Sequence, residues 1–283
     1  MAAPENLIPE PLARFAARLE AGGDAPAGGS GVLVAVAHAD DETIGLGGQL
    51  ERLRPITIVH VTDGAPRKGN DARDRGFGSP EDYAAARRGE LEAAMAEAGI
   101  TPASLLSMGI ADQDAPLRIP DIARLLAGLI VESRPEFLCT HPFEGGHPDH
   151  DAVALGAWAA CLLAQRDGVD PPAVIEMASY HLGPDGAAFG RFAEAGPELA
   201  LPLSDVDFAR KQRMLDAHAT QRDRLDAFRS RVERFRLAPA HAWNAPPNGG
   251  RLLYEHMALG WRGAAWREAA GRALSELGLE SAP

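Results

Sequence analysis

The feature that most constrains this chain is an apolar run at residues 31–37, GVLVAVA, which is rich in valine and stops at His38. Continuous apolar runs of this length are typical of parallel strands that are buried on both faces of a sheet. Similar runs follow, and stretches with helical periodicity separate them. The pattern predicts further strands at 56–62, 103–110 and 136–140, and helices at 79–100, 119–134 and 148–164. This alternation predicts an α/β fold with a mainly parallel sheet.

The last third of the chain is less regular. Its pattern predicts strands at 173–182 and 251–259, a long charged helix at 205–235 and a final helix at 264–277. We find no internal repeat and no convincing linker, so we expect a single domain over residues 1–283. Within it we expect an N-terminal helix and linker (1–30), an α/β core that carries the reactive motifs (31–166) and a C-terminal part that completes the pocket (167–283).

The composition excludes several classes of partner. The chain has a formal net charge of −12, whereas proteins that bind nucleic acids or anionic membranes usually present a basic face. No apolar stretch approaches the ~20 residues of a membrane-spanning helix, and the N-terminal residues lack the apolar core of a secretory signal. Cys139 and Cys161 both lie in apolar stretches and are expected to be buried thiols. We therefore expect a cytoplasmic protein without a nucleic-acid or membrane partner.

Two polar clusters stand where predicted strands end. HADDE at 38–42 follows the first predicted strand, and HPDHD at 147–151 follows the fourth. Ligands of open α/β sheets bind at the carboxyl ends of the strands, so both clusters are expected at one edge of the sheet. In each cluster two ligand-type side chains are three residues apart, on one face of a first helical turn: His38 with Asp41, and His147 with His150. Two imidazoles and a carboxylate with an open fourth position are the usual composition of a catalytic zinc site.

Other interpretations of these clusters stay open from the residues alone. Asp40 or Asp41 would serve as a helix cap, and HPDHD would serve as a polar helix start on the surface. The glycines of TIGLGGQL (43–50) also allow a nucleotide-binding Rossmann-type protein, although the G-x-G-x-x-G spacing is absent and acids at a helix start repel a pyrophosphate. A third interpretation is a non-catalytic metal-binding protein. Four other histidines are expected to be structural: His60, His181, His241 and His256. His141 is one residue past a predicted strand end, within reach of the site, but is not expected to be a ligand.

A family resemblance distinguishes between these interpretations. AHADDE, followed about 110 residues later by GGHPDHD, resembles the paired AHPDDE and HPDH motifs of the PIG-L/LmbE-like deacetylases. The resemblance runs from about residue 31 to about 166. It implies a Rossmann-like, LmbE-like sheet with helices on both faces. It also implies a zinc-dependent enzyme that removes acetyl from N-acetylglucosaminyl groups, as in mycothiol and bacillithiol synthesis.

The resemblance also implies a ligand set for the metal. His38, Asp41 and His150 would bind Zn²⁺, with Fe²⁺ or another divalent cation as the alternative, since two histidines and a carboxylate suit both. The chain departs from the family at Ala39, where the family has proline. Proline would stiffen the turn by fixing φ, so alanine puts the fine geometry in doubt more than the identity of the ligands.

The same resemblance implies roles for five further residues. Asp40 would be the general base, His147 would stabilise the oxyanion, and Asp149 would hold the His147 imidazole. Arg87 and Asp112 fall where the family contacts its sugar. The implied reaction is hydrolysis of the acetyl amide of an N-acetyl amino sugar or glycoconjugate by a zinc-bound hydroxide. The sequence does not identify the sugar or the oligomeric state.

Overall fold

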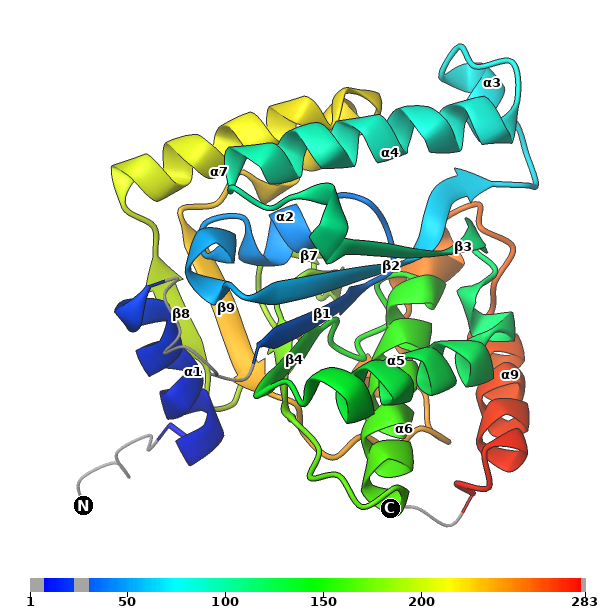
Figure 1. Cartoon of the computed structure of the whole chain (residues 1–283). Helices are drawn as coiled ribbons and strands as arrows, with labels where there is room; N and C mark the ends of the chain where they lie inside the picture. The colour runs from blue at the N-terminus through cyan, green and yellow to red at the C-terminus, as the bar shows by residue number, and fades with distance from the viewer. Residues whose placement is uncertain (1–7, 23–30, 281–283) are drawn as a thin grey trace.

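A seven-stranded sheet forms the centre of the molecule (Figure 1). The structure is a computed structural model of the chain, and it describes residues 8–22 and 31–280. The strand order is β3-β2-β1-β4-β5-β9-β8; strands β3 to β5 in this order run parallel, and β9 and β8 add antiparallel pairings at one end. The strands are β1 (Val32–Val36), β2 (Ile56–Pro66), β3 (Leu105–Asp112), β4 (Phe137–Thr140), β5 (Ala173–Met177), β8 (Leu199–Pro202) and β9 (Val232–Leu237).

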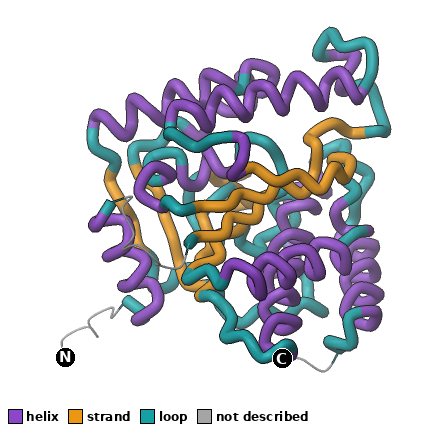
Figure 2. The backbone as a smooth tube through the Cα atoms, in the orientation of Figure 1, coloured by secondary structure: helices purple, strands orange, loops and turns teal. Residues whose placement is uncertain are grey.

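Helices cover both faces of this sheet, so that strands lie between two helical layers (Figure 2). One face packs against α1 (Glu10–Ala21), α2 (Asp41–Leu46), α4 (Pro80–Glu97) and α7 (Asp205–Ala217). The other packs against α5 (Ile119–Ser133), α6 (Pro148–Arg166) and α9 (Gly263–Glu276). The elements that remain are the short helices α3 (Asp71–Asp74) and α8 (Arg222–Leu225), and a hairpin of β6 (Tyr180–Gly183) and β7 (Gly186–Phe189). The predicted α/β fold with helices on both faces is confirmed.

Several helix ends follow from local chemistry. Ser79 is the N-cap of α4, where its hydroxyl accepts a hydrogen bond from the backbone N–H of Asp82 at 3.1 Å, and Pro80 occupies the first helical position. Helix α5 ends at Ser133, two residues before Pro135, because the residue before a proline is disfavoured in helical conformation. These boundaries agree with the predicted ones.

The C-terminal third contains the errors of the prediction. The helix expected at 205–235 ends at Ala217, and its last part is strand β9, which pairs with both β5 and β8. Residues 232–237 alternate so that Phe235 enters the core, and pairing with two neighbouring strands outweighs their helix propensity. The strand expected at 251–259 is also wrong, since this segment holds a single 3-10 turn at Leu253–His256.

The order of the strands brings the two polar clusters together. From β1 the chain proceeds outward through β2 and β3, and it then returns to place β4 on the other side of β1. Such a reversal opens a crevice at the carboxyl ends of the two central strands. HADDE follows β1 and HPDHD follows β4, so both clusters enter this crevice. No helix within residues 8–22 and 31–280 has the length and apolar character that crossing a membrane requires.

Candidate metal centre

Two helix starts carry the clustered side chains. Helix α2 begins at Asp41 directly after β1, and α6 begins at Pro148 with His147 as its N-cap. The imidazole Nδ1 of His147 accepts the backbone N–H of Asp149 at 3.2 Å. All of these residues are buried, including Asp149, which is 0% exposed. The centre therefore lies inside the crevice rather than on an open surface, which argues against a merely solvated polar loop.

Three residues, His38, Asp41 and His150, form a small triangle in this crevice. His38 Nδ1 lies 3.2 Å from an Asp41 carboxylate oxygen and 3.3 Å from His150 Nε2, and His150 Nε2 lies 3.3 Å from the other Asp41 oxygen. A tetrahedral zinc ion with bonds of about 2.0–2.2 Å keeps its ligand atoms about 3.3 Å apart. The donor set therefore fits a divalent cation in size and in chemistry.

A second group of donors lies on the opposite edge of the His38 ring. His38 Nε2 is 3.2 Å from Asp112 Oδ1 and 3.3 Å from Asp149 Oδ2. The ligand atoms of these three residues and of His147 all lie within 4.8 Å of one another. Asp149 is fixed by backbone N–H groups of Gln113 at 2.7 Å and Ala115 at 3.2 Å. Its carboxylate thus orients the His38 ring and reaches His147 Nδ1 only at 3.9 Å.

The charges in the crevice require a positive partner. Burial alone would lower the pKa of His38, but Asp112 and the other carboxylates around it raise that pKa well above its ordinary value. Burial lowers the pKa of His150 to about 4, so this ring is neutral and its Nε2 is available as a ligand. Burial raises the pKa of Asp41, but His150 and His141 outweigh it and hold that pKa well below the usual range. A proton on His38 supplies the positive charge that a bound cation would otherwise supply.

Asp40 lies outside the triangle and has a different environment. Burial, opposed in part by Arg87, raises the pKa of its carboxyl to about 7. The Arg87 guanidinium donates to Asp40 Oδ2 at 3.0 Å, to the carbonyl of Ala39 at 2.9 Å and to the carbonyl of Gly64 at 2.7 Å. Arg87 is 3% exposed. Arg87, which was expected to contact the sugar, thus donates its hydrogen bonds to Asp40 and to two nearby backbone carbonyls. Asp112, the other residue expected at the sugar, lies beside His38.

Two further rings lie next to the centre: His141, which was considered within reach of it but not expected as a ligand, and Tyr180, which was not predicted. His141 stacks on His150 with ring centroids 3.9 Å apart, and its Nε2 lies 3.4 Å from Asp41 Oδ2. That nitrogen accepts the backbone N–H of Ala37 at 3.0 Å, so its lone pair is already used. The ring of Tyr180, at the start of the hairpin, lies 5.1 Å from the ring of His150. No spacing signal marks Tyr180 in the sequence, because the hairpin is brought to the centre only by the tertiary fold.

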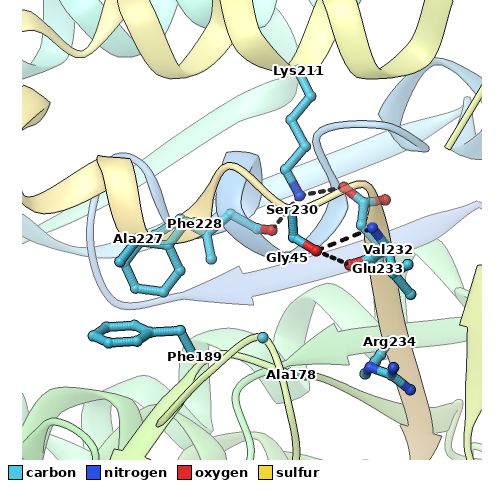
Figure 3. Close-up of a pocket in the computed structure, with 12 residues that line it drawn as sticks. Gly45, Ala178, Phe189, Lys211, Ala227, Phe228, Ser230, Val232, Glu233 and Arg234 are labelled. Carbon is cyan, nitrogen blue, oxygen red and sulfur yellow. Dashed lines mark hydrogen bonds and ion pairs between the residues drawn. The ribbon is translucent and has the colours of Figure 1, made fainter. Parts of the chain in front are cut away.

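A small cavity lies behind α2, away from the centre (Figure 3). Its volume is about 30 Å³, and its lining includes Gly45 and Lys211 but none of the clustered histidines and aspartates. Lys211 Nζ donates to the Ile44 carbonyl and to Glu233 Oε1, both at 2.7 Å. This region therefore supports the C-terminal end of α2 from behind.

With this geometry described, comparisons with known proteins become informative. The sequence model of the PIG-L family, described as GlcNAc-PI de-N-acetylase, matches residues 33–161. Residues 33–161 therefore resemble a PIG-L domain. The matched segment runs from β1 to the middle of α6 and includes both polar clusters, so the resemblance inferred from the two motifs is confirmed.

Curated relatives resemble the same part of the chain, and a solved structure shares its fold. A protein of Catenulispora acidiphila, named 1D-myo-inositol 2-acetamido-2-deoxy-alpha-D-glucopyranoside deacetylase 2, is 31% identical over a 160-residue alignment that covers 48% of this chain and 53% of that protein. A deacetylase of the same sugar from Nocardioides sp. is 30% identical over a 168-residue alignment that covers 47% of this chain and 54% of that protein. The chain thus spans about half the length of these curated relatives. The zinc-inhibited form of teicoplanin deacetylase Orf2 has the same fold, with a TM-score of 0.55 and 17% identity over 72% of this chain and 97% of that one.

Proposed function

We propose that this protein is a metal-dependent amide hydrolase that removes the acetyl group from the nitrogen of an N-acetyl amino sugar. One observation carries the proposal. His38 Nδ1 and His150 Nε2 lie 3.3 Å apart, and each lies 3.2–3.3 Å from one oxygen of the Asp41 carboxylate. The separate carboxyl of Asp40 stands next to them in the chain, with a pKa raised to about 7. A ligand triangle with an unliganded carboxyl beside it is the composition that metal-assisted hydrolysis needs.

The metal would be held by His38 Nδ1, the Asp41 carboxylate and His150 Nε2, and we propose zinc as the ion. When bound, such an ion polarises a carbonyl oxygen and lowers the pKa of water. The remaining edge of His38 is oriented by the carboxylates of Asp112 and Asp149. Partners of this kind fix the ring orientation of metal-ligating histidines and raise their basicity.

Asp40 would act as the general base. A base is most effective when its pKa lies near the working pH, and burial raises the pKa of Asp40 to about 7. Asp40 would accept a proton from the attacking water and then return it to the leaving amine. An amide needs this second transfer, because an unprotonated amine is a poor leaving group.

His147 would stabilise the negative charge that develops on the carbonyl oxygen. Its Nδ1 accepts the N–H of Asp149, so the neutral ring carries its proton on Nε2 and can donate from there. Burial, with the neighbouring His38, lowers the pKa of His147 well below the ordinary value. We therefore expect His147 to donate as a neutral imidazole rather than as a protonated imidazolium. The backbone N–H of Asp149 would hold the His147 ring, whereas the Asp149 carboxylate would orient the His38 ring.

The substrate class follows from the relatives. The two curated relatives are named for a 2-acetamido-2-deoxy-glucopyranoside carried on inositol. We propose an N-acetylglucosamine-type sugar or glycoconjugate as the substrate of this protein, with Asp112 at the sugar-facing side of the centre, where its side chain is 10% exposed. Arg87 would act on the base rather than on the sugar, because its guanidinium is buried.

The test is release of acetate. Zinc-loaded protein would be incubated with a panel of N-acetylated sugars, free acetate would be measured, and the Asp40→Asn variant would serve as the matched control. We expect acetate from at least one glucosamine derivative, and little from the variant. Equal acetate release by a metal-free preparation would overturn the proposal.

Two other functions are less well supported. In a nucleotide-binding protein the start of α2 would receive a phosphate, but Asp41 and Glu42 are buried there, and carboxylates repel an anion at that place. A metal-binding protein without catalysis does not need the additional carboxyl of Asp40. Burying that carboxyl costs free energy, which a catalytic role would explain.

A further inference from the structure

One peptide group at the centre is held at both ends by side chains of opposite charge. The carbonyl of Ala39 accepts a hydrogen bond from Arg87 Nη2 at 2.9 Å, and the N–H of Asp40 donates to Glu42 Oε2 at 3.2 Å. Both groups belong to the peptide that joins Ala39 to Asp40. The cation is on its negative end and the anion on its positive end, so the pair fixes the direction of the peptide dipole.

This peptide precedes an unusual backbone conformation. Asp40 has φ 147° and ψ −24°, in a region that residues with a Cβ rarely adopt. Conformations of this kind persist only where the surroundings enforce them, and they concentrate at functional sites. Because of this turn, Asp40 faces Arg87 while Asp41, the next residue, faces the two histidines of the triangle.

Glu42 is itself firmly anchored. It is 0% exposed, its Oε2 lies 3.0 Å from His60 Nε2, and its Oε1 accepts the hydroxyl of Thr43 at 2.7 Å. None of these hydrogen bonds joins the Glu42 carboxylate to His38, Asp41 or His150. A buried carboxylate is costly unless it is paired and hydrogen-bonded. The Glu42 carboxylate thus joins the Asp40 amide to a buried network that includes His60 and Thr43.

Arg87 is anchored from the other side. Besides Ala39 and Asp40 it donates to the carbonyl of Gly64 at 2.7 Å. Gly64 has φ +70°, and a Cβ at this position would lie 2.5 Å from Arg87 Nη1. A side chain at residue 64 would therefore displace the guanidinium, so glycine is required for the approach.

We propose that Arg87 and Glu42 are positioning residues that act through the Ala39–Asp40 peptide and aim the carboxylate of Asp40. The inference rests on the proposed function, which makes Asp40 the general base.

A double-mutant cycle tests this role by kinetics. Glu42→Leu and Arg87→Met are each made alone and in the Asp40→Asn background, and kcat, KM and bound zinc are measured. Each single variant is expected to lower kcat 10- to 100-fold, with KM changed less than threefold and zinc retained. In the Asp40→Asn background the same changes are expected to have no further effect on kcat, because residues that act through one group are not additive. A full additional loss there would overturn the proposal.

Conservative variants and a control complete the cycle. Glu42→Gln keeps an oxygen that can accept the Asp40 amide, so it is expected to recover most of the kcat that Glu42→Leu loses. Glu176→Gln alters another buried carboxylate, which pairs with Arg236 and His241, and is expected to leave kcat within twofold in both backgrounds. Equal losses in Glu42→Gln and Glu42→Leu would contradict a role in hydrogen bonding to the amide.

A measurement without substrate separates this inference from the proposed function. Amide hydrogen exchange is followed at Asp40 and, as an internal reference, at Val36 in β1. Exchange at Asp40 is expected to accelerate at least tenfold in Glu42→Leu, with Val36 unchanged. If wild-type protein releases no acetate, the proposed function fails while this exchange still decides whether Glu42 holds the peptide. Unchanged exchange at Asp40 would overturn the positioning role even in an active deacetylase.

Discussion

At the scale of single residues, Asp40 and Asp41 are adjacent in the chain yet differ in electrostatic environment. Burial raises the pKa of Asp40 to about 7, with Arg87 only partly opposing it. Asp41 is equally buried, but the imidazoles of His150 and His141 hold its pKa well below the ordinary value. One carboxyl is suited to exchanging a proton near neutral pH, and the other to remaining an anion that binds a cation.

The first prediction concerns the proposed base. Asp40→Asn is expected to bind zinc as the wild type does and to lose about 10²- to 10⁴-fold in kcat, the usual contribution of general acid–base catalysis. Metal analysis beside the acetate assay measures both quantities. Stoichiometric loss of zinc from the variant would make Asp40 a ligand and would refute the proposed role.

The second prediction concerns the ligand triangle. Asp41→Ala and His150→Ala are each expected to weaken zinc affinity at least about 100-fold, more than the loss typical of a partner outside the ligand shell. His256→Ala is the control, since His256 is exposed and is not among the clustered donors. Competition with a chromogenic chelator reports the affinities. Unchanged affinity in both Asp41→Ala and His150→Ala would refute this ligand set.

At the scale of elements, α7 supports α2 and thereby the residue that begins it, Asp41. Lys211 of α7 is 1% exposed and reaches the carbonyl of Ile44 near the end of α2, while it pairs with Glu233 of β9. Glu233 Oε1 also accepts the backbone N–H of Gly48. The strand that the sequence pattern placed in a helix is therefore part of the support for the metal centre.

The third prediction follows from this buried pair. Lys211→Met is expected to lower the free energy of unfolding by about 3–5 kcal/mol, because it leaves the buried Glu233 carboxylate without its cation. Arg213→Ala removes an ion pair of the same helix, but that pair with Glu97 is exposed, so a change of less than about 1 kcal/mol is expected. Urea unfolding measures both. Equal destabilisation by the two substitutions would contradict the assigned role of Lys211.

At the scale of the whole molecule, buried histidines make stability depend on pH. Burial lowers the pKa of His218 to about 4, whereas the unfolded chain titrates near the ordinary value of about 6.5. Between these two values the unfolded state binds more protons than the folded state. The stabilising contribution is therefore complete above pH 6.5 and is lost as the pH falls toward 4.

The fourth prediction uses this linkage. The free energy of unfolding of the wild type, relative to that of His218→Gln, is expected to fall by about 2 kcal/mol between pH 7.5 and pH 5, from 1.36 kcal/mol per unit of pKa. His256 is exposed, so His256→Gln is expected to leave the pH dependence unchanged. Denaturant titrations at the two pH values give this difference in the free energy of unfolding. A difference that increases from pH 7.5 to pH 5 would show that the expected sign of the pH dependence is wrong.

Prediction from sequence succeeded where a signal is local. The parallel strands and the helices between them follow from runs of apolar residues and from caps such as Ser79 and Pro80. It failed for β9, whose residues read as a charged helix until two neighbouring strands are present to pair with them. Arg87 was placed from the family's R-x-x-E helix, and only the tertiary structure gives the group that its guanidinium meets, Asp40 Oδ2 at 3.0 Å.

By itself, the sequence determined which residues are available for chemistry and in what order, because HADDE and HPDHD each follow an apolar run that can only be buried. Only the tertiary structure decided which groups each of those residues contacts. The placement of β4 beside β1 brings His150 to within 3.3 Å of His38. The peptide between Ala39 and Asp40 turns one aspartate away from its neighbour, since contacts from α4 and from Glu42 determine its direction. Composition along a chain specifies donors and charges, whereas their distances depend on elements that are remote in sequence.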